Sequence, residues 1–158
     1  AVPRHRDTLV SGRTDASLSL WQCKRGEPPE ASLAGTLQGH MGRVSCVAAF
    51  PSGDRAVSGH SDGVVQIWQL KSGTCLATWD SGFSSGVACL AAFPSGDRLL
   101  CCASRGRGGT EDMGIKLYDV SSGDCLATWS DDDLSQMFAE QPPHRGHITR
   151  VGVLPSGE

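Results

Sequence analysis

The segment CVAAFPSGDR at residues 46–55 returns almost unchanged 43 residues later, as CLAAFPSGDR at residues 89–98. Further along, CLATW at residues 75–79 returns 50 residues later, at residues 125–129. The second copy therefore holds seven additional residues, which are residues 105–111. An internal repeat of this length indicates a chain built from similar structural units that stack on one another.

Two partial copies flank the two whole ones. Val10-Ser11-Gly12, followed by Asp15 and Trp21, matches Val57-Ser58-Gly59, followed by Asp62 and Trp68. Another copy begins at Ile148 and continues through Leu154-Pro155-Ser156-Gly157. The chain therefore samples four repeats.

Each whole unit contains four short runs rich in Val, Ile, Trp and Cys, which are residue types that favour strands. In the first whole copy they are residues 44–50, 55–59, 64–70 and 74–79. Between them lie segments with Pro, Gly, Asp and Ser, which are the residues that tight turns require. The sequence thus predicts an all-β chain with four antiparallel strands per unit.

Composition narrows the class of protein. The hydrophobic content of 39% is enough for a core, and the formal charge of -3 gives no general attraction for nucleic acid or anionic membranes. No stretch reaches the roughly 18 apolar residues of a membrane span. The first ten residues include Arg4, His5, Arg6 and Asp7, where a signal peptide needs an apolar run. We expect a soluble protein of the cytoplasm or nucleus.

The seven cysteines fit this location as reduced thiols. Cys46 and Cys89 share one position of the repeat, and Cys75 and Cys125 share another, always among apolar residues. No Cys-x-x-Cys pair or histidine cluster accompanies them, so we interpret them as small buried hydrophobic residues and predict neither a metal nor a cofactor.

A period near 43 residues with four short strands is typical of a propeller blade. The motifs Gly39-His40, Ser58-Gly59, Asp62-Gly63 and Ile67-Trp68 resemble those of the WD40 repeat family. The resemblance covers nearly the whole chain and implies an all-β partial β-propeller with blades of four antiparallel strands. The expected division is a partial blade at 8–38, a full blade at 39–80, a degenerate full blade with an insertion at 81–130, a rim segment at 131–142 and the start of a further blade at 143–158.

The chain starts and ends inside blades and lacks an initiator Met. We therefore expect a fragment of a larger multi-repeat protein, whose closed ring would need about four to eight blades. The alternative is a designed or crystallised piece that closes by assembling with copies of itself. The oligomeric state is left open.

The resemblance also implies a hydrogen-bonded set inside each blade, formed here by His40, Ser58, Asp62 and Trp68. Such a set satisfies buried polar groups that would otherwise each cost about 1 to 3 kcal/mol. The partial sets in the other copies comprise Ser11, Asp15, Trp21, Asp112 and His144. In the degenerate copy Phe83, Cys101 and Tyr118 replace the histidine, serine and tryptophan, so we expect that blade to depend on apolar packing. A hydrolase with Ser58 as nucleophile is the catalytic alternative, but Ser58 is not the central serine of a Gly-x-Ser-x-Gly elbow.

In propellers of the WD40 family, the loops before the innermost strand and after the second strand open on one face, which commonly binds partners. Basic side chains occur at several of these positions and could grip an acidic peptide, a phosphorylated segment or a nucleic-acid backbone. Ordinary solvated loop residues are the alternative interpretation. The candidates are Arg13, Arg43, His60, Arg105, Arg107 and His147.

Two insertions distinguish the degenerate copy. Arg105-Gly106-Arg107-Gly108-Gly109 is similar to Arg-Gly segments that contact RNA, but a flexible loop is the preferred interpretation of this single short copy. The segment from Ser130 to Phe138 has a capping serine and acidic residues in its first turn, which predicts a short helix on the rim.

The resemblance to the WD40 family, together with the lack of a catalytic constellation, favours a non-catalytic scaffold that binds other proteins or peptides within a larger multidomain protein or assembly. The alternative is a propeller that contacts RNA in a ribonucleoprotein through its basic loop face. We expect no membrane association.

Overall fold

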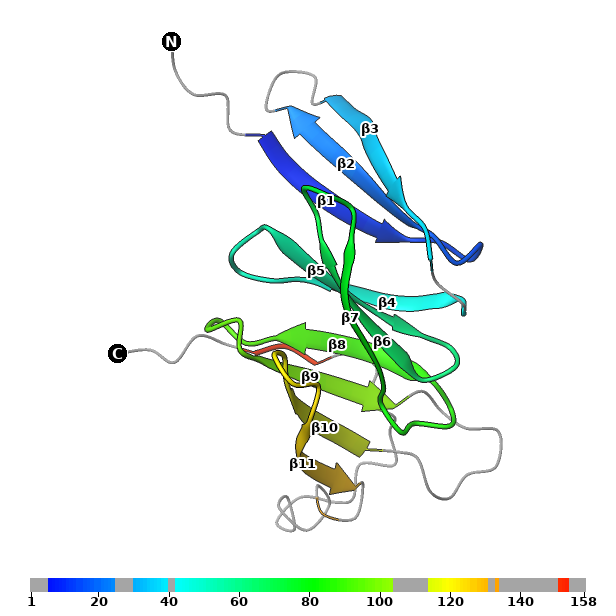
Figure 1. Ribbon diagram of the computed structural model, residues 1–158, viewed down its shortest axis with the longest axis vertical. Coiled ribbons are helices and arrows are strands. Elements are labelled where there is room, and N and C mark those ends of the chain that lie inside the picture. Colours follow the sequence, from blue (N-terminus) through cyan, green and yellow to red (C-terminus); the bar gives the residue numbers. More distant parts are fainter. Residues whose placement is uncertain are drawn as a thin grey trace, which may run out of the picture.

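The computed structural model describes residues 6–24, 30–39, 42–103, 114–130, 133 and 151–153. This part of the chain contains eleven strands, which form three antiparallel sheets arranged one after another along the molecule (Figure 1). The predicted all-β class is therefore confirmed, and the arrangement is that of a partial propeller.

Each sheet is a meander, because strands that are neighbours in the chain are also neighbours in the sheet. The first sheet contains β1 (Arg6–Gly12), β2 (Leu18–Lys24) and β3 (Glu30–Leu37). The second contains β4 (Val44–Ala49), β5 (Arg55–His60), β6 (Val64–Gln69) and β7 (Cys75–Asp80). The third contains β8 (Val87–Ala92), β9 (Arg98–Ala103), β10 (Gly114–Asp119) and β11 (Cys125–Ser130).

The three sheets share their irregularities. A register shift interrupts the pairing of β2 with β3 after Leu20, of β6 with β7 after Ile67, and of β10 with β11 after Leu117. These three positions correspond in the repeat, so the bulge is a feature of the unit and not of one sheet.

The core lies between the sheets. One cluster joins the second and third sheets and includes Val57, Ile67, Leu90 and Leu99, each less than a tenth exposed. A smaller cluster joins the first and second sheets around Leu18 and Trp68. Each sheet therefore buries its apolar face against a neighbouring sheet, as stacked repeats must.

A glycine in β1 and the corresponding glycine in β5 allow neighbouring sheets to approach closely. A Cβ added to Gly12 would stand 2.5 Å from Val44 Cγ1, and one added to Gly59 would stand 2.7 Å from Val87 Cγ1. Gly12 and Gly59 occupy the same position of the repeat, and Val44 and Val87 both begin the innermost strand of the next sheet. The valine of one sheet thus fills the space left by the missing side chain of the preceding one.

A second contact that recurs in the repeat is an arginine stacked on a phenylalanine ring, at the opposite end of the innermost strands β4 and β8. The guanidinium of Arg55 lies 4.6 Å from the centre of the Phe50 ring, and Arg98 lies 4.7 Å from that of Phe93. Arg55 Nη2 also donates to the Gly96 carbonyl of the third sheet at 3.5 Å. Each stacked pair lies within its own sheet, and the hydrogen bond from Arg55 ties the second sheet to the third at their turns.

The seven cysteines are free thiols. Cys89, Cys101 and Cys102 are buried, but Cys75 and Cys125 are exposed on the edge strands β7 and β11, so the prediction of buried cysteines is wrong for these two. Within the described ranges, no group of three or more His, Cys, Asp or Glu side chains is placed to hold a metal ion. No helix long and apolar enough to cross a membrane occurs in that same part of the chain.

Candidate interaction site

A chain of buried hydrogen bonds crosses the second sheet. Trp68 Nε1 donates to Ser58 Oγ at 3.0 Å, and Ser58 Oγ lies 3.0 Å from His60 Nε2. His60 Nδ1 lies 3.1 Å from the Gly42 carbonyl oxygen. Because a carbonyl oxygen can only accept, Nδ1 carries a proton, and in the neutral imidazole Nε2 accepts from the Ser58 hydroxyl. The indole, hydroxyl and imidazole thus link strands β5 and β6 to the segment that leads into β4.

His60 lies inside the second sheet and not on the loop face where we expected it. The repeat position suggested a basic side chain on the loop face, but the structure buries His60 to 1% exposure beside Ser58. The alternation of strand side chains explains this, since residues two apart in β5 point to the same face. That alternation was the signal in the sequence that would have placed His60 next to Ser58.

Asp62 lies in the turn that follows β5. Its Oδ1 accepts a hydrogen bond from the Val64 amide at 3.2 Å, and a Cβ on Gly42 would clash with its carboxylate. The carboxylate therefore faces the loop between the first two sheets. His40 belongs to that loop but lies outside the described residues, so the set of His40, Ser58, Asp62 and Trp68 stays a prediction.

The first sheet repeats part of this arrangement. Trp21 Nε1 donates to Ser11 Oγ at 2.9 Å, as Trp68 does to Ser58. Asp15 does not join them, because it pairs locally: Ser17 Oγ donates to its Oδ1 at 2.6 Å, and Arg13 Nε lies 3.4 Å from its Oδ2. The hydrogen bond from Ser17, together with the charge of Arg13, holds the pKa of Asp15 below its usual value.

The third sheet replaces the polar set with apolar packing, as predicted. Phe83, Cys101 and Tyr118 are all buried in the cluster shared with the second sheet. Tyr118 Oη nevertheless keeps a hydrogen bond, which it donates to the Ser81 carbonyl at 2.6 Å. Lys116 Nζ donates to the same carbonyl at 2.8 Å and lies 4.3 Å from the centre of the Phe83 ring. The alignment of the repeats did not predict a role for Lys116.

Ser58 is fully buried, so a substrate cannot reach its hydroxyl in this structure. The neighbouring imidazole is occupied by hydrogen bonds on both nitrogens. The geometry is that of a structural tie between strands.

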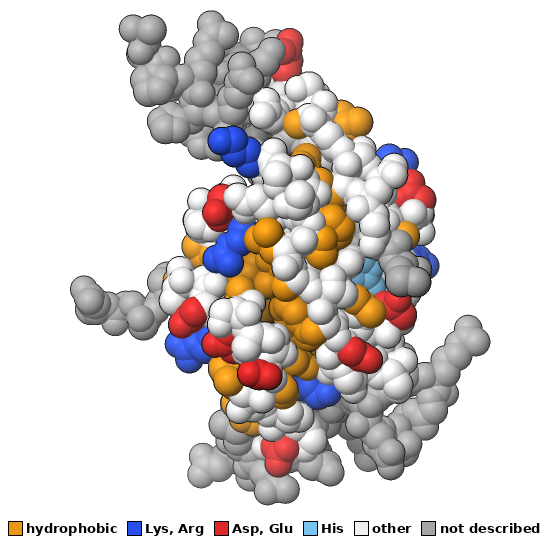
Figure 2. Space-filling view, viewed as in Figure 1, with side chains coloured by type: hydrophobic (Ala, Val, Ile, Leu, Met, Phe, Trp, Pro, Cys, Tyr) orange, Lys and Arg blue, Asp and Glu red, His pale blue; other side chains and the backbone are white. Residues whose placement is uncertain are grey.

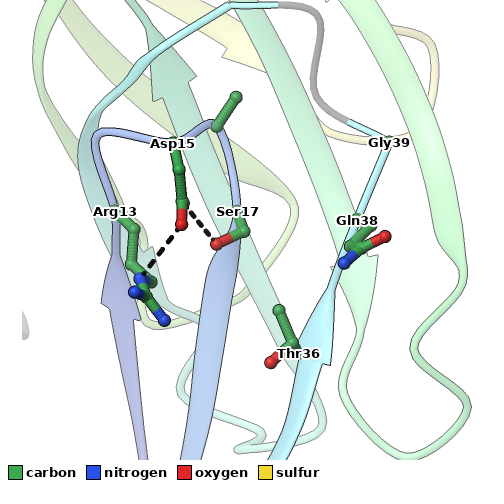
Figure 3. Close-up of a pocket in the computed structure, with 7 residues that line it drawn as sticks. Arg13, Asp15, Ser17, Thr36, Gln38 and Gly39 are labelled. Atoms are coloured by element: carbon green, nitrogen blue, oxygen red, sulfur yellow. Dashed lines mark hydrogen bonds and ion pairs between the residues drawn. The ribbon is translucent and has the colours of Figure 1, made fainter.

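A cavity of about 540 Å³ opens at the end of the first sheet. As Figure 3 shows, it lies between the turn joining β1 to β2 and the segment that follows β3. Its walls are predominantly polar. They are formed by Arg13, Asp15, Ala16, Ser17, Thr36, Gln38 and Gly39.

This cavity is on the face where the loop from the first to the second sheet also lies, because antiparallel meanders place alternate connections at the same end. Of the predicted basic candidates, Arg13 lines the cavity but is paired with Asp15, and Arg43 is exposed. Within the described residues, two of the candidates, Arg13 and Arg43, therefore lie on this face, and the charge of Arg13 is balanced by Asp15. Asp112, His144, Arg105, Arg107 and His147 lie outside the described residues.

The predicted rim helix begins with the expected contact. The Asp133 amide donates to Ser130 Oγ at 3.2 Å, and the Ser130 amide donates back to Asp133 Oδ2 at 2.8 Å. This reciprocal pair is the geometry of a helix N-cap. The helix was predicted over residues 130–138, and of residues 131–142 the structure describes only Asp133, so the helix itself stays a prediction.

Repeated four-stranded meanders, joined face to face and tied by a buried Ser and Trp pair, define the propeller class of repeat proteins. The family model described as "WD domain, G-beta repeat" matches residues 31–69 and 73–119. The chain belongs to this family.

Comparison with curated proteins gives partial matches. The chain is 32% identical over 78 residues to eukaryotic translation initiation factor 3 subunit I of Candida albicans, covering 49% of this chain and 21% of that protein. It is 36% identical over 75 residues to small ribosomal subunit protein RACK1y of Oryza sativa subsp. japonica, covering 48% and 21%. It is 33% identical over 87 residues to mitochondrial division protein 1 of Kluyveromyces lactis, covering 50% and 12%. The matches span about a fifth or less of these relatives.

Proposed function

We propose that this chain is part of a non-catalytic scaffold that binds other proteins through the loop face bearing the cavity. Membership of the WD domain family carries this proposal, since the polar residues that resemble a catalytic set are buried structural ties. Fold alone does not define function, so the proposal also depends on the surface.

The surface supports protein binding in two ways. The cavity wall combines a carboxylate, a guanidinium, two hydroxyls and an amide, which suits hydrogen bonding to a peptide. The sheets beneath are fixed to one another by buried apolar clusters, so the loops are carried on a rigid support.

Two relatives bear names of translation components, one an initiation factor subunit and the other a small ribosomal subunit protein. We extend the proposal to an assembly of this kind in the cytoplasm. The three relatives named above do not point to the nucleus.

The RNA-contacting alternative is weaker on the described surface. Arg13 is paired with Asp15 and His60 is buried, so these side chains do not offer free positive charge to phosphate. The formal charge of -3 also provides no general attraction.

Site-specific photocrosslinking tests the proposal. A photoreactive amino acid replaces Gln38, which is exposed at the cavity, or Ser122, which is exposed in the turn between β10 and β11 at the opposite end of the strands. We expect protein crosslinks from position 38 that exceed those from position 122 and that survive high salt. Crosslinks to RNA from position 38, lost at high salt, would overturn the proposal in favour of the alternative. Equal crosslinking at both positions would exclude the loop face as the binding surface.

A further inference from the structure

Cys89 of β8 and Cys102 of β9 are directly opposite one another in the antiparallel ladder of the third sheet. Opposite residues in such ladders have Cα atoms about 4.5 or 5.5 Å apart, depending on the hydrogen-bonding pattern. Disulfides form across Cα separations of about 4.4 to 6.8 Å. The backbone register therefore places these two thiols within bonding range without movement of either strand.

The two side chains also interact. A hydrogen bond from the Cys102 thiol lowers the pKa of Cys89, and a backbone hydrogen bond from Val151 acts in the same direction. The same interaction with Cys89, together with burial, raises the pKa of Cys102. The pair is thus asymmetric, with a nucleophilic sulfur at Cys89 and a protonated neighbour at Cys102.

The preceding sheet contains an internal comparison. Cys46 occupies the repeat position of Cys89, but its cross-strand partner is Gly59 where Cys89 has Cys102. Cys46 has no opposing thiol, and burial raises its pKa to about 12. The third sheet alone among the described sheets combines the two cysteines in one cross-strand pair.

Cys102 also stands at the position where Gly12 and Gly59 admit a valine of the next sheet. Its side chain therefore occupies space that a valine of the next sheet fills at the two preceding interfaces. Cys89 likewise faces the segment Val151–Val153, whose Val151 backbone contacts it. The pair thus lies on the face of the third sheet that meets the chain continuing from residue 151.

We propose that Cys89 and Cys102 form a redox-active dithiol, which a peroxide converts to a cross-strand disulfide at the face that meets the following segment. This inference is independent of the proposed scaffold function.

The reaction has two balanced steps. The Cys89 thiolate attacks one peroxide oxygen, the O–O bond breaks, and Cys89 becomes a sulfenic acid while hydroxide leaves and takes up a proton as water. The Cys102 sulfur then attacks the Cys89 sulfur, losing its proton as the S–O bond breaks and a second water forms. The two thiols lose two electrons in total, and hydrogen peroxide gains them.

The arrangement suits this order of events. Cys89 is 8% exposed, which leaves a small opening for a small oxidant, whereas Cys102 is fully buried. Cys102 needs no access to peroxide, because it reacts only with its neighbour. Cys101 faces the opposite side of the sheet, toward the core shared with the second sheet, and burial raises its pKa.

Peptide mapping of the folded, peroxide-treated chain tests the proposal. In a Cys75→Ser background, trypsin yields residues 72–98 with Cys89 as their one cysteine, and residues 99–105 with Cys101 and Cys102. After free thiols are blocked with N-ethylmaleimide, we expect a linked pair of these peptides that disappears on treatment with dithiothreitol.

Two neighbouring variants provide the matched control. Cys102→Ala should abolish the linked pair, and Cys101→Ala should retain it. Because alanine is smaller than the cysteine it replaces, it adds no clash at position 102, and near-ultraviolet circular dichroism verifies folding. The proposal fails if peroxide oxidises the exposed Cys125 with no linked pair present. It fails equally if Cys101→Ala, and not Cys102→Ala, removes the link, or if the link forms only in urea.

Discussion

Gly59 of β5 lies against Val87 of β8, so closely that a Cβ on Gly59 would stand 2.7 Å from both Val87 Cγ1 and Cys46 Sγ. Two rigid neighbours, one from the same sheet and one from the next, thus occupy the space of a side chain. This contact sets the distance between the second and third sheets.

Gly59→Ala should therefore destabilise the protein by about 1 to 3 kcal/mol through overpacking. Urea denaturation followed by tryptophan fluorescence measures the loss. Gly35→Ala is the matched control, because a Cβ at Gly35 of β3 meets nothing within 4 Å. If both variants are equally stable, the inference that the two sheets pack closely at Gly59 is wrong.

Ala16 is the one non-glycine residue with positive φ among the described residues, at 62°. Gly63 holds the same position in the next unit, with φ of 89°. An L-residue with this backbone conformation destabilises the fold by about 1 to 2 kcal/mol. Glycine avoids that steric cost, but it loses more conformational entropy on folding, so the net gain is smaller.

Ala16→Gly should consequently raise the free energy of unfolding by up to about 1 kcal/mol. Ala49→Gly in strand β4 provides the contrast, because there glycine should lower stability by about 0.5 to 1 kcal/mol. Chemical denaturation of the two variants gives both values. A loss of stability in Ala16→Gly would contradict the strained turn.

The repeat offset predicted the sheets well, because strand identity depends on local residue type and turn chemistry. The 43-residue spacing aligned β4 and β5 with β8 and β9, and their bulges coincide. The buried hydrogen bonds were harder to predict. Sequence comparison assigned His60 by its repeat partner Arg13, although its neighbours in β5 place it inside.

The site was less predictable than the fold for a physical reason. A cavity depends on how two loops meet in space. The turn at Arg13 and the segment at Gln38 line the same cavity, but nothing in the sequence of either predicts that they are neighbours. The pairing of Cys89 with Cys102 similarly requires the strand register, which the bulge before Cys89 shifts by one residue.

Ser58→Ala removes the acceptor of the Trp68 indole and the partner of His60 in a site with no exposure to water. Each buried polar group left without its partner costs about 1 to 3 kcal/mol. Ser11→Ala removes the corresponding acceptor of Trp21 in the half-buried first sheet, where water can replace it.

We therefore expect Ser58→Ala to lower the unfolding free energy clearly more than Ser11→Ala does. Urea titrations of the two single variants under identical conditions provide the comparison. Equal losses would mean that the hydrogen-bond chain through Ser58 contributes no more than its partly solvated counterpart.

Tyr118 is the single tyrosine of the chain, so the absorbance of tyrosinate reports its titration alone. Burial raises the pKa of Tyr118 above its usual value of 10. The unfolded chain therefore releases this proton first as the pH rises. The stability that depends on the protonated phenol is fully present below pH 10 and declines as the pH rises from there toward the folded-state pKa.

Tyr118→Phe should cost about 1 kcal/mol at neutral pH, because the hydrogen bond to Ser81 is lost. The variant should also lose stability less steeply than the parent above pH 10, because it lacks this titrating phenol. Urea titrations at neutral and alkaline pH, combined with tyrosinate absorbance of the folded parent, measure these effects. A folded-state midpoint at 10, or identical alkaline slopes in the two proteins, would show that Tyr118 titrates as though it were solvated.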